Sequence, residues 1–328
     1  MTTRRTLLLA LGAALLDRPR AAAAQRPAKT WRVGYLAAGA RPADDLPPAA
    51  LRRALLELGY VPGRNVEFVT RFAQGRSERL PDLARELVAS KADVLVTLGW
   101  KGAHALLDAT ATIPVVFVGA GDPVAAGLVA TLARPGRNAT GISDQSTELS
   151  AKRMELLLQL VPNARRIAVL WNADDLAMTL RYREIERAAR TLTVSVQALG
   201  VHEPEDFDQA FASMVKDRPD ALMLVTDALT ILNRRRVLEF TTQRSIPAMF
   251  EFGSLVREGG LVSYGPDFDD MFARAGVYID RILHGTPAGE LPVEQPTRYY
   301  LLINVATARA LGLSVPASLM LRADEIVK

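Results

Sequence analysis

Several acidic and aromatic side chains stand at or near the ends of short apolar runs, where they could hold a small solute. These side chains are Trp100, Asp122, Asp227, Glu251 and Tyr264. A tryptophan ring can stack on a ligand ring or cover apolar ligand surface. A carboxylate can accept hydrogen bonds from a ligand amine. The chemistry that these residue types indicate is recognition of a small molecule.

Each of these residues also has an ordinary structural explanation. Asp122, which precedes a proline, could cap a helix, and so could Asp227. The N–H groups of a helix that starts at Asp122 could equally hold an anionic part of a ligand. Trp100 could pack under a neighbouring loop. Glu251 lies inside a predicted strand and points either into a cleft or away from it, and Tyr264 could touch ligand or protein.

Signatures of catalysis and of cofactor binding are missing from the sequence. The glycine-rich stretch 119–124 lacks the third glycine of the dinucleotide fingerprint, and no P-loop or nucleophile elbow is present. The three histidines, His104, His202 and His284, stand far apart. The absence of cysteine excludes thiolate metal sites and cysteine nucleophiles. We therefore expect no catalytic residues, no metal and no cofactor.

The elements that must position these side chains alternate between strand-like and helix-like patterns, which indicates parallel sheets with crossover helices. The predicted strands are 31–37, 65–72, 93–98, 114–119, 166–171, 194–199, 221–226 and 247–252. Apolar stripes at helical spacing predict helices over 78–90, 204–216 and 268–284. Asp267 can cap the last of these helices and Gly285 can end it.

The alternation occurs twice, which predicts an α/β fold of two Rossmann-like lobes with parallel sheets. The short extended stretches 139–143 and 261–265 would cross between the lobes as a hinge, with a third crossing near 286–297. We expect the first lobe to contain 25–143 and about 267–296, and the second to contain 144–266 and about 297–328.

A cleft between the lobes would hold the ligand, because ligands of open parallel sheets bind beyond the carboxyl ends of the strands. The loops that would line it are 37–45, 98–102, 120–123, 172–175, 227–230 and 252–254. Ala38 and Asn172 belong to these loops and join the candidate ligand-binding residues.

The N-terminus is typical of an export signal. Arg4 and Arg5 precede an apolar run over 7–16, which is too short to span a bilayer as an anchor. Small residues before Gln25 predict cleavage near Ala24. The general secretory route and the twin-arginine route both fit this segment. We expect a periplasmic protein, free of a lipid anchor because it has no cysteine.

The charge of the chain resides mostly in this segment. The whole chain carries a net charge of +4 and its first 24 residues carry +3, so the exported part is close to neutral. A nearly neutral protein gives no indication of nucleic-acid binding.

Longer runs of the sequence resemble one ABC transporter substrate-binding family, which includes binding proteins for tryptophan and tyrosine. The resemblance is carried by 121–136 (GDPVAAGLVATLARPG), 138–141 (NATG), 168–172 (AVLWN), 263–267 (SYGPD), 291–296 (LPVEQP) and 321–325 (LRADE). It extends over nearly all of the chain after the signal.

This resemblance implies a type I periplasmic-binding-protein fold and no enzyme activity. Two lobes would close on a small solute, and the closed form would dock on an ABC permease in the inner membrane, driven by its ATPase. Carried over by position, the ligand-binding residues would be Gly99, Trp100, Gly121 and Asp122, with Asp227 or Glu251 holding an amine. A monomer is expected, since docking needs an open face on each lobe.

Three other functions are compatible with two α/β lobes. An exported ligand sensor would report to a membrane receptor rather than to a transporter. A two-domain α/β enzyme would need an acid–base constellation, which the sequence does not show. A DNA-binding regulator would need a basic helical pair at the N-terminus, where this chain has its export signal. The sequence therefore favours capture of a small solute such as an amino acid or an aromatic compound.

Overall fold

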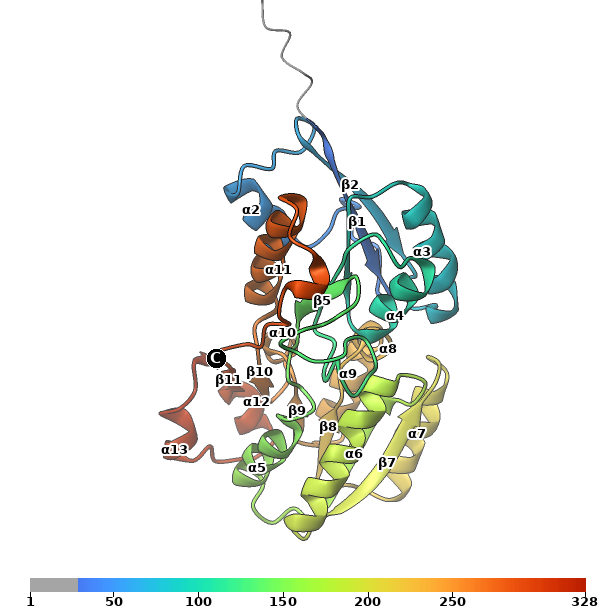
Figure 1. Cartoon of the computed structure of the whole chain (residues 1–328). Helices are drawn as coiled ribbons and strands as arrows, with labels where there is room; N and C mark the ends of the chain where they lie inside the picture. Colours follow the sequence, from blue (N-terminus) through green and yellow to red (C-terminus); the bar gives the residue numbers. More distant parts are fainter. Residues whose placement is uncertain (1–28) are drawn as a thin grey trace, which may run out of the picture. The chain divides into compact units, whose positions relative to one another are not determined.

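Two β-sheets organise residues 29–328, the part of the chain that the computed structural model describes (Figure 1). Residues 31–328 form one compact unit. The predicted export signal, residues 1–24, lies outside the described residues. Within the described range, no helix combines the length and the apolar composition that crossing a bilayer requires.

The first sheet is parallel throughout, with strand order β2-β1-β3-β4-β5. Its strands are β1 (Trp31–Ala37), β2 (Val66–Phe72), β3 (Val94–Leu98), β4 (Val115–Val118) and β5 (Ala139–Ile142). Its two faces are covered by helices, so its strands are apolar on both sides. One face carries α2 (Ala49–Glu57) and α11 (Phe268–Leu283), and the other carries α3 (Leu80–Ala89) and α4 (Trp100–Ala109). We call this sheet with its helices the first lobe.

The second sheet has the order β12-β11-β10-β9-β8-β6-β7, with one antiparallel pair, β10 and β11. Its strands are β6 (Arg166–Asn172), β7 (Ser195–Val201), β8 (Ala221–Leu224), β9 (Ala248–Phe250), β10 (Val262–Gly265), β11 (Tyr300–Asn304) and β12 (Glu325–Val327). Helices cover both of its faces as well. One face packs on α5 (Ser150–Leu160), α6 (Leu176–Thr191), α12 (Val305–Ala310) and α13 (Ala317–Met320). The other packs on α7 (Asp206–Lys216), α8 (Ala228–Leu232), α9 (Arg234–Gln243) and α10 (Gly253–Arg257). We call this sheet with its helices the second lobe.

The predicted fold class, two α/β lobes with parallel sheets, is confirmed. All eight predicted strands are present, each within two residues of its predicted ends. The three predicted helices correspond to α3, α7 and α11. Asp267 caps α11 as predicted, since its carboxylate accepts from the N–H groups of Asp269 and Asp270. Gly285 follows the end of α11 with a φ of +99°, a conformation that favours glycine.

The crossings between the lobes differ from the prediction. The stretches 139–143 and 261–265 are not linkers between the sheets, because β5 pairs with β4 and β10 pairs with β9 and β11. The chain crosses directly after each of these strands, and a third time after Glu294, which bridges Ile142 at the edge of the first sheet. Gly141 serves close packing, since a Cβ there would lie 2.0 Å from the carbonyl oxygen of Phe117.

Helix α11 returns the chain to the first lobe and packs closely on α2. A Cβ at Gly276 of α11 would lie 2.8 Å from the Cβ of Ala54 in α2. This contact holds α11, which lies in sequence between β10 and β11 of the second lobe, against the first lobe.

Gly276→Ala should therefore lower the free energy of unfolding by about 1–3 kcal/mol through overpacking. The loss would appear although alanine is favoured over glycine by about 1 kcal/mol in an ordinary helix interior. Urea unfolding followed by circular dichroism measures it. Adding Ala54→Gly, which removes the opposing methyl group, should recover part of the loss. A Gly276→Ala protein as stable as the parent would contradict the close approach.

Candidate functional site

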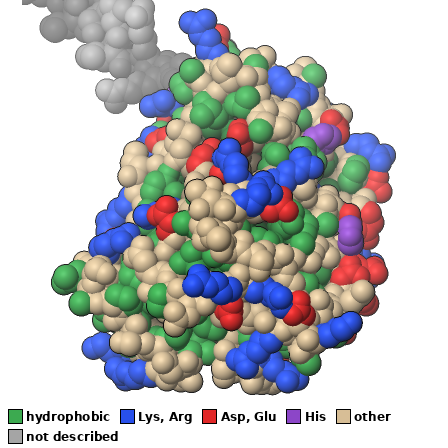
Figure 2. Space-filling view, turned by 90° about the horizontal axis from the view of Figure 1, so that it is seen from below, with side chains coloured by type: hydrophobic (Ala, Val, Ile, Leu, Met, Phe, Trp, Pro, Cys, Tyr) green, Lys and Arg blue, Asp and Glu red, His purple; other side chains and the backbone are tan. Residues whose placement is uncertain are grey.

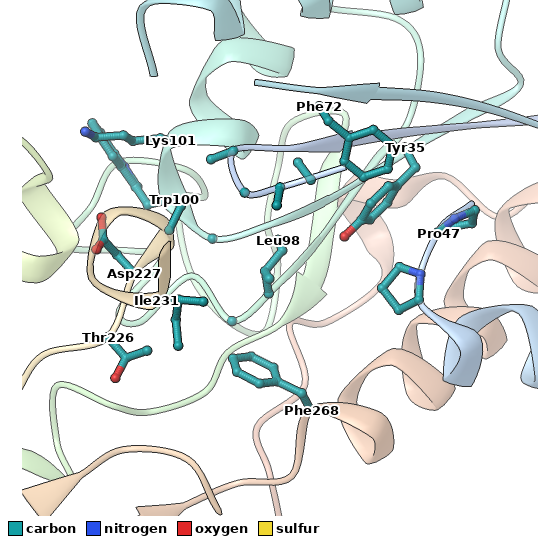
Figure 3. A pocket seen from close by; sticks show the side chains of 18 of the residues that line it. Tyr35, Pro47, Phe72, Leu98, Trp100, Lys101, Thr226, Asp227, Ile231 and Phe268 are labelled. Carbon is teal, nitrogen blue, oxygen red and sulfur yellow. The ribbon is translucent and has the colours of Figure 1, made fainter. Parts of the chain in front are cut away.

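A cavity of about 490 Å³ lies between the lobes, at the carboxyl ends of strands from both sheets. Its walls come from segments that follow β1, β3 and β4 in the first lobe and β6, β8 and β9 in the second. Figure 3 shows the side chains that line it. The position agrees with the rule that ligands of open parallel sheets bind at this edge.

Charged side chains from both lobes meet at one end of the cavity. Lys101 lies in the first turn of α4, whereas Asp175 and Asp227 stand at the starts of α6 and α8. In the described part of the chain, no carboxylate lies within ion-pair distance of the Lys101 ammonium, whose hydrogen-bond contact is Ser77 Oγ at 3.5 Å. The first lobe thus contributes a cation to this end of the cavity, and the second lobe contributes two carboxylates.

Asp227 caps α8 and lines the cavity at the same time. Its Oδ1 accepts from the backbone N–H of Thr230 at 2.9 Å, while the Thr230 hydroxyl accepts from the N–H of Asp227 at 2.9 Å. This reciprocal pair is a capping box. Its Oδ2 accepts from the side-chain amide of Asn172 at 2.6 Å. Asn172 therefore orients the carboxylate of Asp227, and the cap fixes its place at the cavity wall.

Asp175 is a buried carboxylate beside Asp227. Its Oδ1 accepts from the N–H groups of Ala177 and Met178 at the start of α6, and the residue is only 4% exposed. Burial, with a smaller contribution from the negative charge of Asp227, raises its pKa to about 6, against the lowering effect of Lys101. A cation that binds at this end of the cavity would stabilise the ionised form of this buried carboxylate.

Most of the remaining cavity wall is apolar. Figure 3 shows Tyr35, Phe72 and Pro47 on the far side from Lys101 and Asp227. The side chains that make this part of the wall apolar are Tyr35, Leu46, Pro47, Phe72, Leu98, Ile231, Phe252 and Phe268. A ligand that fills the cavity needs an apolar body of corresponding size.

Four buried charges lie behind the cavity. Arg181 donates to Asp144 Oδ2 and to Glu251 Oε2, both at 2.9 Å, and Arg153 donates to Glu251 Oε1 at 3.2 Å. Each of these side chains is at most 3% exposed. Arg153 also donates to the carbonyl of Tyr264 at 2.7 Å. Asp144 follows β5 and Tyr264 precedes the crossing after β10, so the cluster holds two crossings together.

Burial acts differently on the two arginines of this cluster. Burial lowers the pKa of Arg153, and the negative charge of Glu251 is the main influence that raises this pKa again. Burial also disfavours the charge on Arg181, but Asp144 and Glu251 together raise its pKa above the ordinary value. Arg181 is thus the cation on which the cluster depends. Arg181 and Asp144 also reach the cavity wall, so the cluster connects the crossings to the ligand site.

Four of the predicted ligand-binding residues line the cavity: Ala38, Gly99, Trp100 and Asp227. Gly99 has a φ of +81°, and a Cβ there would meet no atom within 4 Å. The indole of Trp100 donates to the carbonyl of Ala126 at 2.9 Å and packs against the cores of both lobes. Trp100 therefore packs against the protein and lines the cavity at the same time.

The other predicted residues lie outside the lining of this cavity: Gly121, Asp122, Asn172, Glu251 and Tyr264. Asp122 caps a turn rather than a helix, accepting from the N–H groups of Val124 and Ala125, and borders a separate groove beside α6. Glu251 points into the buried cluster. The ring of Tyr264 lies 6.0 Å from that of Tyr299.

Several residues of the site were not among the candidates from sequence, chiefly Tyr35, Lys101, Asp144, Asp175 and Arg181. The strand-end rule could have found Lys101 and Asp175, because they fall in the loops 98–102 and 172–175. Nothing in the sequence marks Tyr35 inside a strand or Arg181 inside a helix. Within residues 29–328, no group of three or more histidine, cysteine or acidic side chains is arranged to hold a metal ion.

Comparison with known proteins agrees with this fold. The family model described as "ABC transporter substrate binding protein" matches residues 40–327. The chain belongs to this family of substrate-binding transport proteins, whose members are typically exported. The predicted type I periplasmic-binding-protein fold and solute-binding function are thereby confirmed.

Three relatives illustrate the similarity. A tyrosine-binding protein of Clostridioides difficile (strain R20291) is 28% identical over 261 residues, which cover 80% of this chain and 75% of that protein. A conserved domain protein of Vibrio cholerae is 28% identical, with a TM-score of 0.85 over 91% of this chain and all of that one. An ABC domain of Streptococcus pneumoniae in complex with L-Trp is 24% identical, with the same TM-score and coverage.

The buried cluster predicts a large effect on stability. Arg181→Met should lower the free energy of unfolding by about 3–5 kcal/mol, because Asp144 and Glu251 would remain buried without their cation. Arg187→Met is the matched control on the same helix, since the Arg187 guanidinium pairs with Glu184 at the surface. It should leave stability unchanged within error. Chemical denaturation of both variants measures the difference, and equal stabilities would refute the role given to Arg181.

Proposed function

We propose that the cavity captures a zwitterionic solute of the amino-acid type. The observation that carries this proposal is the way the helices around the cavity begin. In the first lobe, α2 and α4 start at Pro48 and Gly99, which provide no side-chain cap. In the second lobe, α6 and α8 start at Asp175 and Asp227, whose carboxylates serve as caps. Of these four helix starts, the two in the first lobe thus offer N–H donors and the two in the second offer negative charge. The short helix α10 of the second lobe starts at Phe252 without a side-chain cap.

The carboxylate of the solute would bind at the start of α4. The N–H groups of an uncapped first turn and the positive end of the helix dipole attract anions. The ammonium of Lys101, which has no carboxylate partner in the described residues, adds a full positive charge there. Gly99 leaves open space beside this turn, so a ligand can approach the backbone.

The ammonium of the solute would bind between Asp175 and Asp227. Both carboxylates are fixed by hydrogen bonds from the protein, and burial, with a smaller contribution from Asp227, raises the pKa of Asp175. A ligand ammonium would supply the missing charge. The remaining part of the solute would extend along the apolar wall toward Phe72 and Phe268.

Closure of the lobes would bring the cation of the first lobe and the carboxylates of the second lobe into contact with the same solute molecule. A Cβ at Gly75 of the first lobe would lie 2.6 Å from Cδ1 of Leu232 in α8, so the lobes touch across the cleft. A solute stabilises this closed arrangement only by the extra affinity it has for it. A zwitterion has such extra affinity, because its two charges find partners on different lobes.

We further propose where the protein acts and with which partners, as the family suggests. The protein would be exported to the periplasm after cleavage near Ala24, act there as a monomer, and deliver its solute unchanged to an ABC permease and its ATPase. The lobes would comprise 25–143 with about 267–296, and 144–266 with about 297–328. The distribution of strands between the two sheets supports this division.

The proposal predicts which charges matter for binding. A thermal-shift screen with amino acids, aromatic compounds and small organic acids should find amino acids that raise the melting temperature, since ligand at 100 times its Kd adds about 2.7 kcal/mol of stability. Lys101→Met and Asp227→Asn should each weaken binding by at least about tenfold in calorimetry. Asp122→Asn, outside the cavity, is the control and should bind normally. A screen without any shift would contradict solute capture in this cavity.

Binding should also depend on pH through Asp175. Because its pKa is raised to about 6, this carboxyl is mostly protonated at pH 5 and must lose its proton to pair with a ligand ammonium. Affinity for the amino acid identified in the screen should therefore rise about tenfold from pH 5 to pH 7.5, with proton release on binding near pH 6. Asp175→Asn should bind with little pH dependence over this range. The same slope in the variant would assign the titration to another group.

A further inference from the structure

We propose that the Tyr35 hydroxyl and the start of α2 form a second polar subsite, which selects solutes that carry an oxygen acceptor at the end of their apolar body. The inference rests on the function proposed above, which places the charged head of the solute beside Lys101 and Asp227. The subsite lies at the opposite end of the cavity, where Figure 3 shows Tyr35 and Pro47. It would decide which amino acid is captured, rather than whether an amino acid is captured.

Tyr35 is a buried tyrosine whose hydroxyl faces the cavity. It lies on β1, is 3% exposed, and its ring meets that of Phe72 edge to face at 6.0 Å. In Figure 3 its hydroxyl points into the cavity. Among residues 29–328, no group hydrogen-bonds this hydroxyl, and burial raises its pKa, so it remains neutral. A hydroxyl that faces the cavity without a partner in the described part of the protein is available for a partner on the ligand.

Other buried tyrosines of the first lobe are satisfied by the protein itself. The hydroxyl of Tyr60 donates to Asp280 at 2.9 Å, and that of Tyr278 donates to the carbonyl of Pro292 at 2.6 Å. Both belong to the same apolar core as Tyr35. Tyr35 differs from them in facing the cavity and in lacking such a partner, which indicates that its hydroxyl serves the ligand.

The start of α2 makes this end of the cavity electropositive. Pro47 and Pro48 lead into the nine-residue helix, Pro48 provides no side-chain cap, and Ala49 borders the cavity. Arg52 lies in the first turn, where its Nε donates to the carbonyl of Pro47 at 3.0 Å and its Nη2 pairs with Asp44 at 2.9 Å. Asp44 offsets the charge of Arg52 but leaves the first N–H groups of the helix free. These donors favour an oxygen acceptor over a second ammonium group.

A hydrocarbon at this position would leave the Tyr35 hydroxyl without water and without a partner. Sites built to hydrogen-bond a polar group discriminate strongly against analogues that lack it, because a buried group of the protein is then left unpaired. We expect a preference of at least about tenfold for the oxygen-bearing member of a matched ligand pair. The acceptor can be a hydroxyl, carbonyl, nitro or carboxylate oxygen.

Isothermal titration calorimetry of the full protein with two matched pairs tests the subsite. The pairs are L-tyrosine with L-phenylalanine, and 4-nitro-L-phenylalanine with 4-methyl-L-phenylalanine. In the parent protein, the oxygen-bearing member should bind at least about tenfold tighter in each pair. In Tyr35→Phe, the ratio should fall to within about twofold, mainly through weaker binding of the oxygen-bearing member.

Tyr60→Phe is the matched control, because it removes a buried tyrosine hydroxyl that is bonded within the protein. It should lower the melting temperature and leave both ratios unchanged. Ratios that persist in Tyr35→Phe, or a preference of the parent for the hydrocarbon members, would overturn the subsite. If Asp227→Asn still weakens binding in that case, the proposed function stands without the subsite. Failure of all four compounds to bind would overturn the subsite, whereas the proposed function is overturned only if no amino acid in the thermal-shift screen binds.

Discussion

Four desolvated charges set the geometry on which the cavity depends. Asp144, Arg181, Glu251 and Arg153 come from a crossing, two helices and a strand end, and their side chains are almost completely buried. Buried charges are tolerated only when they are paired with good geometry, so these elements have little freedom to move apart. Because Arg153 also binds the carbonyl of Tyr264, the cluster fixes the chain near two of the three crossings.

The topology of parallel sheets explains why so few residues create the cavity. Every strand of such a sheet ends at the edge where the next helix begins, so helix N-termini collect around the ligand. The chain uses this arrangement in two ways. Aspartate caps in the second lobe cover the N–H groups and leave negative charge, as at Asp175 and Asp227. Gly99 and Pro48 leave the first turns of α4 and α2 open.

This asymmetry between the lobes connects recognition with conformational change. At the charged end of the cavity, Lys101 belongs to α4 of the first lobe, and Asp175 and Asp227 stand at the starts of α6 and α8 of the second lobe. The second lobe also brings the cation of Arg181 to the cavity wall, but Asp144 and Glu251 already pair with it. Under the proposed function, a dipolar solute would be held completely only when the lobes meet, and its extra affinity for the closed form would drive closure. The apolar wall supplies affinity without direction, and polar groups at the two ends of the cavity orient the molecule.

The sequence by itself determined the elements and the family. Alternating apolar runs and helical stripes are local patterns, and they placed all eight predicted strands and the helices α3, α7 and α11. The strand-end rule also led to Gly99, Trp100 and Asp227, because strand ends can be located by counting along the chain. Tertiary structure alone decided the rest. Whether a residue inside a strand or helix, such as Tyr35 or Arg181, faces a cavity depends on which distant segment covers it. The same holds for Glu251, whose position after β9 is local information but whose two arginine partners, 70 and 98 residues away, are not.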